Sequence, residues 1–134
     1  MAEVPAKTIL VVEDDADEAR YLRALLEDHG FAVITAADGA EGLRQARAQR
    51  PDLITLDISM PRHSGVRMLR ELGADPATAR IPVVIITGVS HDLKRFLESR
   101  RQIPSPAAYF DKPPDRKALL AAIRNLLNGA SQAN

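Results

Sequence analysis

The sequence predicts an α/β protein in which a parallel sheet lies between two layers of helices. Short apolar runs rich in β-branched residues occur five times, and helical apolar spacing follows each of them. Three of the runs lack polar alternation, which is typical of strands covered on both faces. Strands that alternate with helices pair in parallel through right-handed crossovers. We therefore expect a (βα)5 three-layer sandwich.

The five expected strands differ in the strength of their sequence signal. The first, third and fourth are continuous apolar runs at residues 9–12, 53–56 and 83–86. The second run lies at residues 32–35, and a weaker fifth run lies at residues 107–110. All five are short enough for ordinary strands.

Five helices are expected from apolar residues that share one helical face. Their starts are marked by residues that can cap a helix or make a turn, and three of their ends by glycine. The faces are Leu22, Leu25 and Leu26; Leu43 and Ala46; Val66, Leu69 and Leu72; Leu93, Phe96 and Leu97; and Leu119, Ile123, Leu126 and Leu127. The start signals are Asp38-Gly39, Ser64, Ser90 and Asp115, and the end signals are Gly30, Gly73 and Asn128-Gly129.

The length and composition of the chain exclude several classes of protein and of functional site. The 134 residues predict a single domain over 1–134, with a core at about 8–128 and short flexible tails at 1–7 and 129–134. Eighteen basic and 18 acidic residues cancel, so no global charge favours nucleic acid or membrane. The absence of cysteine excludes disulfides, thiolate catalysis and zinc–thiolate sites. No signal peptide or bilayer-long apolar run is visible, so a cytoplasmic location is expected.

Reactive side chains follow the predicted strands at one end. Glu13 and Asp14 follow the first strand, Asp57 follows the third, Thr87 ends the fourth, and Lys112 follows the fifth. Ligands of open α/β sheets bind at the carboxyl ends of the strands. We therefore expect these five side chains to form one site.

Several neighbouring carboxylates repel one another unless a cation compensates their charge. Mg²⁺, or Mn²⁺ in its place, suits such a site because it prefers oxygen ligands. Asp14 and Asp57 can supply carboxylates, Glu13 can hold a metal-bound water, and the backbone carbonyl of Ser59 can be a further ligand. The sequence thus predicts a divalent metal site.

A free carboxylate of Asp57 is a plausible nucleophile toward an activated phosphoryl group. Phosphoryl transfer needs mainly positioning and charge neutralisation. Lys112 can pair with one phosphoryl oxygen and Thr87 can donate a hydrogen bond to another. These residues predict phosphoryl acceptance.

Four stretches carry a family resemblance. They are Ile-Leu-Val-Val-Glu-Asp-Asp at 9–15, Asp-Leu-Ile-Thr-Leu-Asp-Ile-Ser-Met-Pro at 52–61, Val-Val-Ile-Ile-Thr at 83–87 and Tyr-Phe-Asp-Lys-Pro at 109–113. With them, the chain from about residue 8 to 127 resembles the receiver domain of bacterial response regulators, the CheY-like superfamily. The resemblance implies a flavodoxin-like fold with a sheet of order 2-1-3-4-5.

The resemblance also implies roles for single residues. Glu13 and Asp14 would be the acidic pair, Asp57 the phosphoacceptor, and Thr87 and Lys112 the phosphate partners. Thr87 would move toward the phosphate and Tyr109 would turn inward as a switch. The Lys112-Pro113 bond is expected to be cis.

Partners follow from the same resemblance. A histidine kinase or histidine phosphotransfer protein would be the donor, and the helix 4–strand 5–helix 5 face would change its binding of a downstream effector, which the sequence does not identify. A phosphorylation-linked dimer is compatible with this scheme. The only catalysis expected is self-catalysed phosphoryl acceptance and autodephosphorylation, in a domain that binds neither nucleic acid directly nor membrane.

The chain departs from the family pattern at three places. Ser64 precedes Gly65 where the family usually has aspartate, Gly88 follows Thr87 where alanine is frequent, and a proline-rich loop is expected at 101–106. This loop differs from the short turn usual in the family. The shape of the output face therefore cannot be inferred from the resemblance.

Alternative functions remain open at this point. The chain could be a receiver fragment of a larger regulator or of a hybrid histidine kinase, a receiver-like domain that is never phosphorylated, a haloacid-dehalogenase-type phosphatase, or a flavin-binding module. The acids at 13–15 disfavour a flavin phosphate, and the phosphatase motif is incomplete at residues 15–19.

Single residues have plainer interpretations too. Asp15, Asp17 and Glu18 are explained by the dipole at a helix N-terminus. Tyr109 is compatible with an ordinary half-buried strand residue, and Lys112 with a solvated surface lysine.

Overall fold

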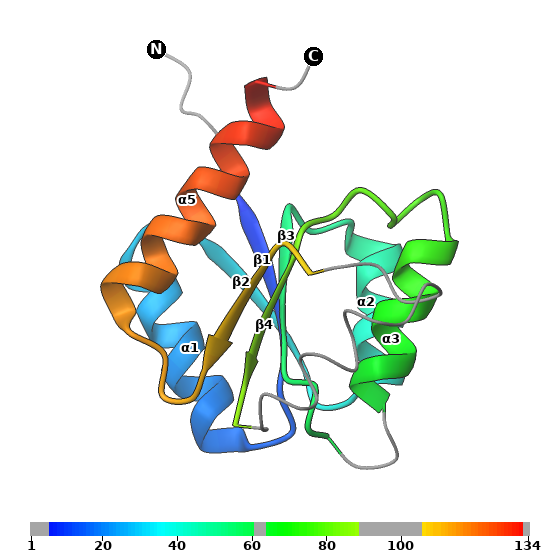
Figure 1. Cartoon of the computed structure of the whole chain (residues 1–134), viewed down its shortest axis with the longest axis horizontal. Helices are drawn as coiled ribbons and strands as arrows, with labels where there is room; N and C mark the ends of the chain where they lie inside the picture. Colours follow the sequence, from blue (N-terminus) through cyan, green and yellow to red (C-terminus); the bar gives the residue numbers. More distant parts are fainter. Residues whose placement is uncertain (1–5, 61–63, 89–105, 133–134) are drawn as a thin grey trace.

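The computed structural model describes residues 6–60, 64–88 and 106–132, and it confirms the predicted sheet (Figure 1). Five parallel strands have the order β2-β1-β3-β4-β5. Each strand begins and ends within one residue of the expected run. The strands are β1 (Thr8–Val12), β2 (Ala32–Ala36), β3 (Leu53–Leu56), β4 (Val83–Thr87) and β5 (Ala108–Asp111).

Helices cover both faces of this sheet, as Figure 1 shows. Packing places α1 (Ala16–Asp28) and α5 (Arg116–Gln132) on one face, and α2 (Gly39–Gln49) and α3 (Ser64–Ala74) on the other. The helix expected after Ser90 lies outside the described residues, as does the loop at 101–106 except for Pro106. No helix in the described ranges is long and apolar enough to cross a bilayer.

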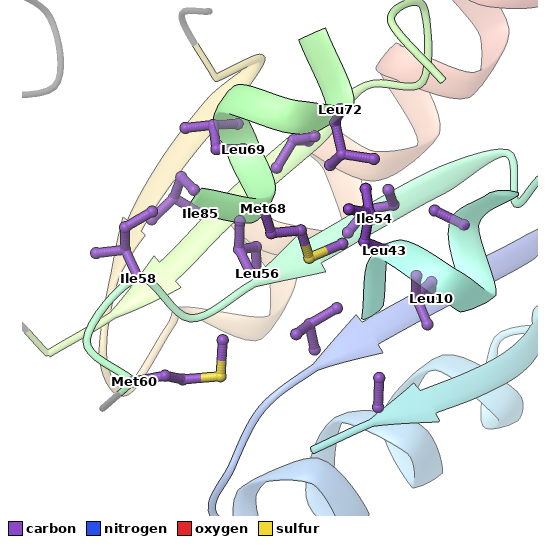
Figure 2. Close-up of a cluster of buried hydrophobic side chains, with 14 residues drawn as sticks. Leu10, Leu43, Ile54, Leu56, Ile58, Met60, Met68, Leu69, Leu72 and Ile85 are labelled. Atoms are coloured by element: carbon purple, nitrogen blue, oxygen red, sulfur yellow. The ribbon is translucent and has the colours of Figure 1, made fainter. Parts of the chain in front are cut away.

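The two halves of the core follow from the alternation of side chains along each strand. In β1, Leu10 and Val12 join the cluster under α2 and α3, which Figure 2 shows, whereas Ile9 and Val11 join the cluster under α1 and α5. The side chains of these four residues are at most 1% exposed. Full burial of such a side chain contributes about 1.5–3 kcal/mol, so the central strands hold both layers on the sheet.

The ends of α1 follow the chemistry of their terminal residues. Asp15 caps the start, because its carboxylate accepts hydrogen bonds from the amides of Asp17 (2.9 Å) and Glu18 (3.1 Å). At the other end, Gly30 has a φ of 89° and its amide donates to the carbonyl of Glu27. Such a left-handed residue costs glycine little, so Gly30 ends the helix as the sequence predicts.

Three predicted helix boundaries are wrong. Gly73, the expected stop of α3, lies inside the helix, which ends at Ala74. Ser64 is the first residue of α3 rather than the residue before it, and its buried hydroxyl has no hydrogen-bond partner within the described residues. Helix α5 continues to Gln132, past the stop expected at Asn128-Gly129. Asp115 does cap α5, through a 3.0 Å bond from the amide of Ala118. A glycine in a helix costs only about 1 kcal/mol, so Gly129 alone does not end the helix.

Candidate functional site

Backbone hydrogen bonds extend the sheet by one residue beyond three of its strands. The amide of Glu13 donates to the last carbonyl of β2, that of Asp57 to the last carbonyl of β1, and that of Lys112 to the last carbonyl of β4, each at 3.0 Å. The side chains of these three residues therefore start from the same edge of the sheet, as the sequence predicts.

Asp57 is buried at the centre of this edge, with its side chain only 3% exposed. Its Oδ1 accepts three hydrogen bonds: from the amide of Ser59 (2.8 Å), the hydroxyl of Ser59 (2.7 Å) and the hydroxyl of Thr87 (2.9 Å). Its Oδ2 accepts one, from Nζ of Lys112 at 3.0 Å. Four donors thus converge on one carboxylate.

These donors decide the charge of Asp57. Burial by itself raises the pKa of the carboxyl group, but the hydrogen bonds from Ser59, Lys112 and Thr87 outweigh it and lower the pKa below its ordinary value. Asp57 is therefore ionised at neutral pH, which a carboxylate nucleophile requires.

Lys112 links the acids of the site. Its ammonium group donates to Oε1 of Glu13 at 2.6 Å, to Oδ2 of Asp57 and to the carboxylate of Glu18. Burial alone lowers the pKa of Lys112, but the bonds to the three acids raise it above its ordinary value. The Lys112-Pro113 peptide is cis, as the resemblance implies. Lys112 is thus a paired cation inside the site and not a solvated surface lysine.

The acids at this edge could hold a cation. Carboxylate oxygens of Glu13, Asp14 and Asp57 lie within 4.8 Å of one another. Burial raises the pKa of Glu13 to about 8, although Lys112 and the amide of Asp15 bond to it. Asp14 is exposed and can accept a metal from solvent. This set of hard oxygen donors fits Mg²⁺.

Thr87 and Tyr109, the two expected switch residues, lie at different depths. The Thr87 side chain is fully buried against Asp57. Tyr109 is half-buried and packs against the core cluster under α2 and α3. Thr87 therefore contacts Asp57 directly, whereas the packing contact of Tyr109 is with this core cluster.

Two side chains in the site were not foreseen from the sequence. For Ser59 the sequence predicts a role of the carbonyl only, yet its amide and hydroxyl both bond to Asp57. An acid whose side chain bonds the amide two residues later is a frequent turn, so this amide contact had a sequence signal. The helix dipole alone does not account for Glu18, because its carboxylate also contacts Lys112. No local signal marks that contact, since 94 residues separate the two.

Comparisons with known proteins agree with this geometry. The family model for the response regulator receiver domain matches residues 9–124. Protein PilH of Pseudomonas aeruginosa is 36% identical, with 90% of this chain and 98% of PilH covered. Hybrid signal transduction histidine kinase D of Dictyostelium discoideum is 35% identical over 89% of this chain, which spans only 7% of that kinase.

A solved structure extends the likeness to the fold. The receiver domain of a sensor histidine kinase from Pseudomonas aeruginosa is 27% identical and superposes with a TM-score of 0.80, with 92% of this chain and 99% of that chain covered. That structure has a magnesium ion coordinated in the active site cleft. The likeness in fold thus extends over most of this chain.

Proposed function

The chain belongs to the response regulator receiver domain family of two-component signalling, and from this we propose that it is a switch that accepts a phosphoryl group on Asp57. Receiver domains are signalling proteins rather than classical enzymes. The proposed chemistry is accordingly limited to acceptance of the phosphoryl group and its later hydrolysis from the same residue.

One observation carries the proposal: Asp57 is buried yet has a lowered pKa, and a cation and a hydroxyl bond to it. A buried carboxylate kept ionised in this way has a lone pair available for attack. Groups that bond to Asp57 are also able to bond to a phosphoryl group attached to it. The same contacts therefore suit both reactant and product.

In the proposed step, a carboxylate oxygen of Asp57 forms a bond to phosphorus. The bond between phosphorus and the donor breaks, and the donor keeps the electron pair; with acetyl phosphate the leaving group is acetate. Lys112 neutralises charge on one phosphoryl oxygen, and the hydroxyl of Thr87 donates to another. The protein supplies position and charge, which are the main requirements of phosphoryl transfer.

Glu13, Asp14 and Asp57, with the carbonyl of Ser59, are proposed to hold Mg²⁺ or Mn²⁺. The proximity of the three carboxylates and the raised pKa of Glu13 support this proposal. A bound divalent ion would neutralise negative charge on the phosphoryl oxygens. Lys112 alone offers one positive charge, which is too little for a dianionic phosphoryl group beside these acids.

The proposed donor is a histidine kinase or a histidine phosphotransfer protein, and the proposed output is altered binding of an effector. Thr87 and Tyr109 are the proposed switch residues. The face formed by helix 4, β5 and α5 would present the change, although helix 4 lies outside the described residues. Similarity to a hybrid kinase supports a second setting, in which this single receiver domain is part of a larger protein.

Labelling with acetyl phosphate tests the acceptor. With Mg²⁺ present, we expect one phosphoryl group per chain by intact-protein mass spectrometry, no label on the Asp57→Asn variant, and none after chelation of the metal. Asp52→Asn is the matched control, because Asp52 lies at the opposite end of β3, where its carboxylate accepts a hydrogen bond from the amide of Thr8. Full labelling of Asp57→Asn would refute the assignment.

A further inference from the structure

The three carboxylates that bond to Lys112 differ greatly in exposure. The side chains of Glu13 and Asp57 are 2% and 3% exposed, whereas that of Glu18 is 44% exposed. Only Glu18 can exchange its bond to Lys112 for bonds to water at little cost, because an unpaired buried carboxylate is strongly unfavourable. The three partners are therefore not equivalent.

A lysine ammonium group has three N–H donors, and in this structure three acids take them. The donor that bonds to Asp57 can pass to a phosphoryl group there, but a dianion with three acceptor oxygens favours a second donor from Lys112 as well. Since Glu13 and Asp57 are held in the buried part of the site, the donor bound to Glu18 is the one that can be released. Electrostatic repulsion also favours the release of Glu18, because its carboxylate places a negative charge where a phosphoryl dianion must enter.

The surroundings leave room for such an exchange. Glu18 and Lys112 line an open cavity of about 350 Å³, together with Tyr21 and Pro113. Glu18 stands in the first turn of α1, where its backbone amide is already bonded to Asp15. Its side chain can thus turn toward the cavity while the helix stays in place.

We infer that Glu18 is a positioning residue that holds Lys112 in the resting site and competes with the phosphoryl group for it. This inference rests on the proposed acceptor role of Asp57. Glu18 is released to solvent when Asp57 is phosphorylated, and it thereby slows phosphorylation. Its effect on the reaction passes through Lys112.

Asp17 provides a matched control for Glu18. Both acids lie in the first turn of α1, so both interact with the helix dipole and carry the same charge. Asp17, however, is 91% exposed and pairs with Arg20 at 3.4 Å. A change at Asp17 removes a charge near the site and leaves the bonds of Lys112 intact.

The test compares initial rates of labelling by acetyl phosphate at saturating Mg²⁺ for the natural chain, Glu18→Gln and Asp17→Asn. Exposed ion pairs have modest energies, so we expect Glu18→Gln to be labelled about 1.5- to 5-fold faster and Asp17→Asn at nearly the natural rate. Equal rates for the two variants, or a slower Glu18→Gln, would overturn the inference. An unlabelled natural chain would instead refute the proposed function.

Urea unfolding separates this role from a purely structural one. A double-mutant cycle of Glu18→Gln and Lys112→Gln should give a non-zero coupling, because each change removes the same ion pair. Absence of coupling overturns the inference, and so does coupling without a difference in labelling rate. The rate comparison needs no change at Lys112, so it decides the question even if Lys112→Gln does not fold.

Discussion

At the scale of single residues, Asp57 combines two properties that ordinarily conflict. A buried carboxyl group usually becomes neutral, yet Asp57 has a lowered pKa because four donors bond to it. The two donors from Ser59 are local, whereas those from Thr87 and Lys112 come from the ends of other strands. The reactive state of Asp57 thus depends on the assembled sheet.

Replacement of Thr87 tests the contribution of one such donor. Thr87→Ala removes a buried 2.9 Å hydrogen bond to an ionised group, so we expect a loss of about 1.5–3 kcal/mol in the free energy of unfolding. Urea unfolding measures this loss. Thr87→Ser is the control, because it keeps the hydroxyl and should lose clearly less. Similar losses in both variants would mean that packing of the methyl group, and not the hydrogen bond, is what matters.

At the scale of secondary-structure elements, the site depends on how closely α3 approaches the end of β3. Gly65 lies in the first turn of α3, and a Cβ atom there would be 2.7 Å from the backbone oxygen of Asp57 and 3.0 Å from Cα of Ile58. Backbone atoms cannot move aside as a flexible side chain can. Gly65 therefore sets the distance between the helix and the loop that carries Asp57.

Gly65→Ala should destabilise the fold by about 1–3 kcal/mol, as overpacking usually does, and it should slow labelling of Asp57. Thermal unfolding and acetyl phosphate labelling measure the two effects. Gly129→Ala is the control, because Gly129 lies in α5 with nothing within 4 Å of the added Cβ. That change should stabilise the helix by about 0.5–1 kcal/mol. If Gly65→Ala changed neither the unfolding temperature nor the labelling rate, α3 would be shown to shift freely.

At the scale of the whole molecule, the acidic edge lowers stability in the absence of metal. Burial raises the pKa of Glu13 from 4.5 to about 8 in the folded state. The folded chain then binds a proton more tightly than the unfolded chain. The stability that Glu13 contributes is therefore fully present below pH 4.5, the pKa of this group in the unfolded chain. It is lost as the pH rises toward about 8, the pKa in the folded chain.

We expect the unfolding temperature in metal-free buffer to fall between about pH 5 and about pH 8, and Glu13→Gln to reduce this fall. Mg²⁺ should raise stability most at the alkaline end, because metal binding favours the ionised carboxylates. Thermal unfolding at several pH values, with Mg²⁺ or with a chelator, measures both trends. A flat profile for the natural chain would contradict the raised pKa of Glu13.

Much of the fold could be predicted from the sequence because its signals are local. Continuous apolar runs such as 53–56 mark buried strands, and Asp15 and Gly30 mark the ends of a helix through bonds to nearby backbone. The positions of Asp57, Thr87 and Lys112 at strand ends were predictable in the same way, since parallel strands bring their carboxyl ends to one edge. The stop expected at Gly129 failed because the helical preference of its neighbours outweighed one weak residue.

The sequence by itself determined the order of strands and helices and the set of reactive groups at one edge, because periodicity and strand ends are properties of neighbouring residues. Only the tertiary structure decided which acids bond to the ammonium group of Lys112. The three acids around Lys112 come from the first 57 residues, and folding leaves their side chains 2%, 44% and 3% exposed for Glu13, Glu18 and Asp57. Burial and hydrogen bonding then set the pKa of Glu13 and Asp57 in opposite directions, which residue identity alone cannot predict.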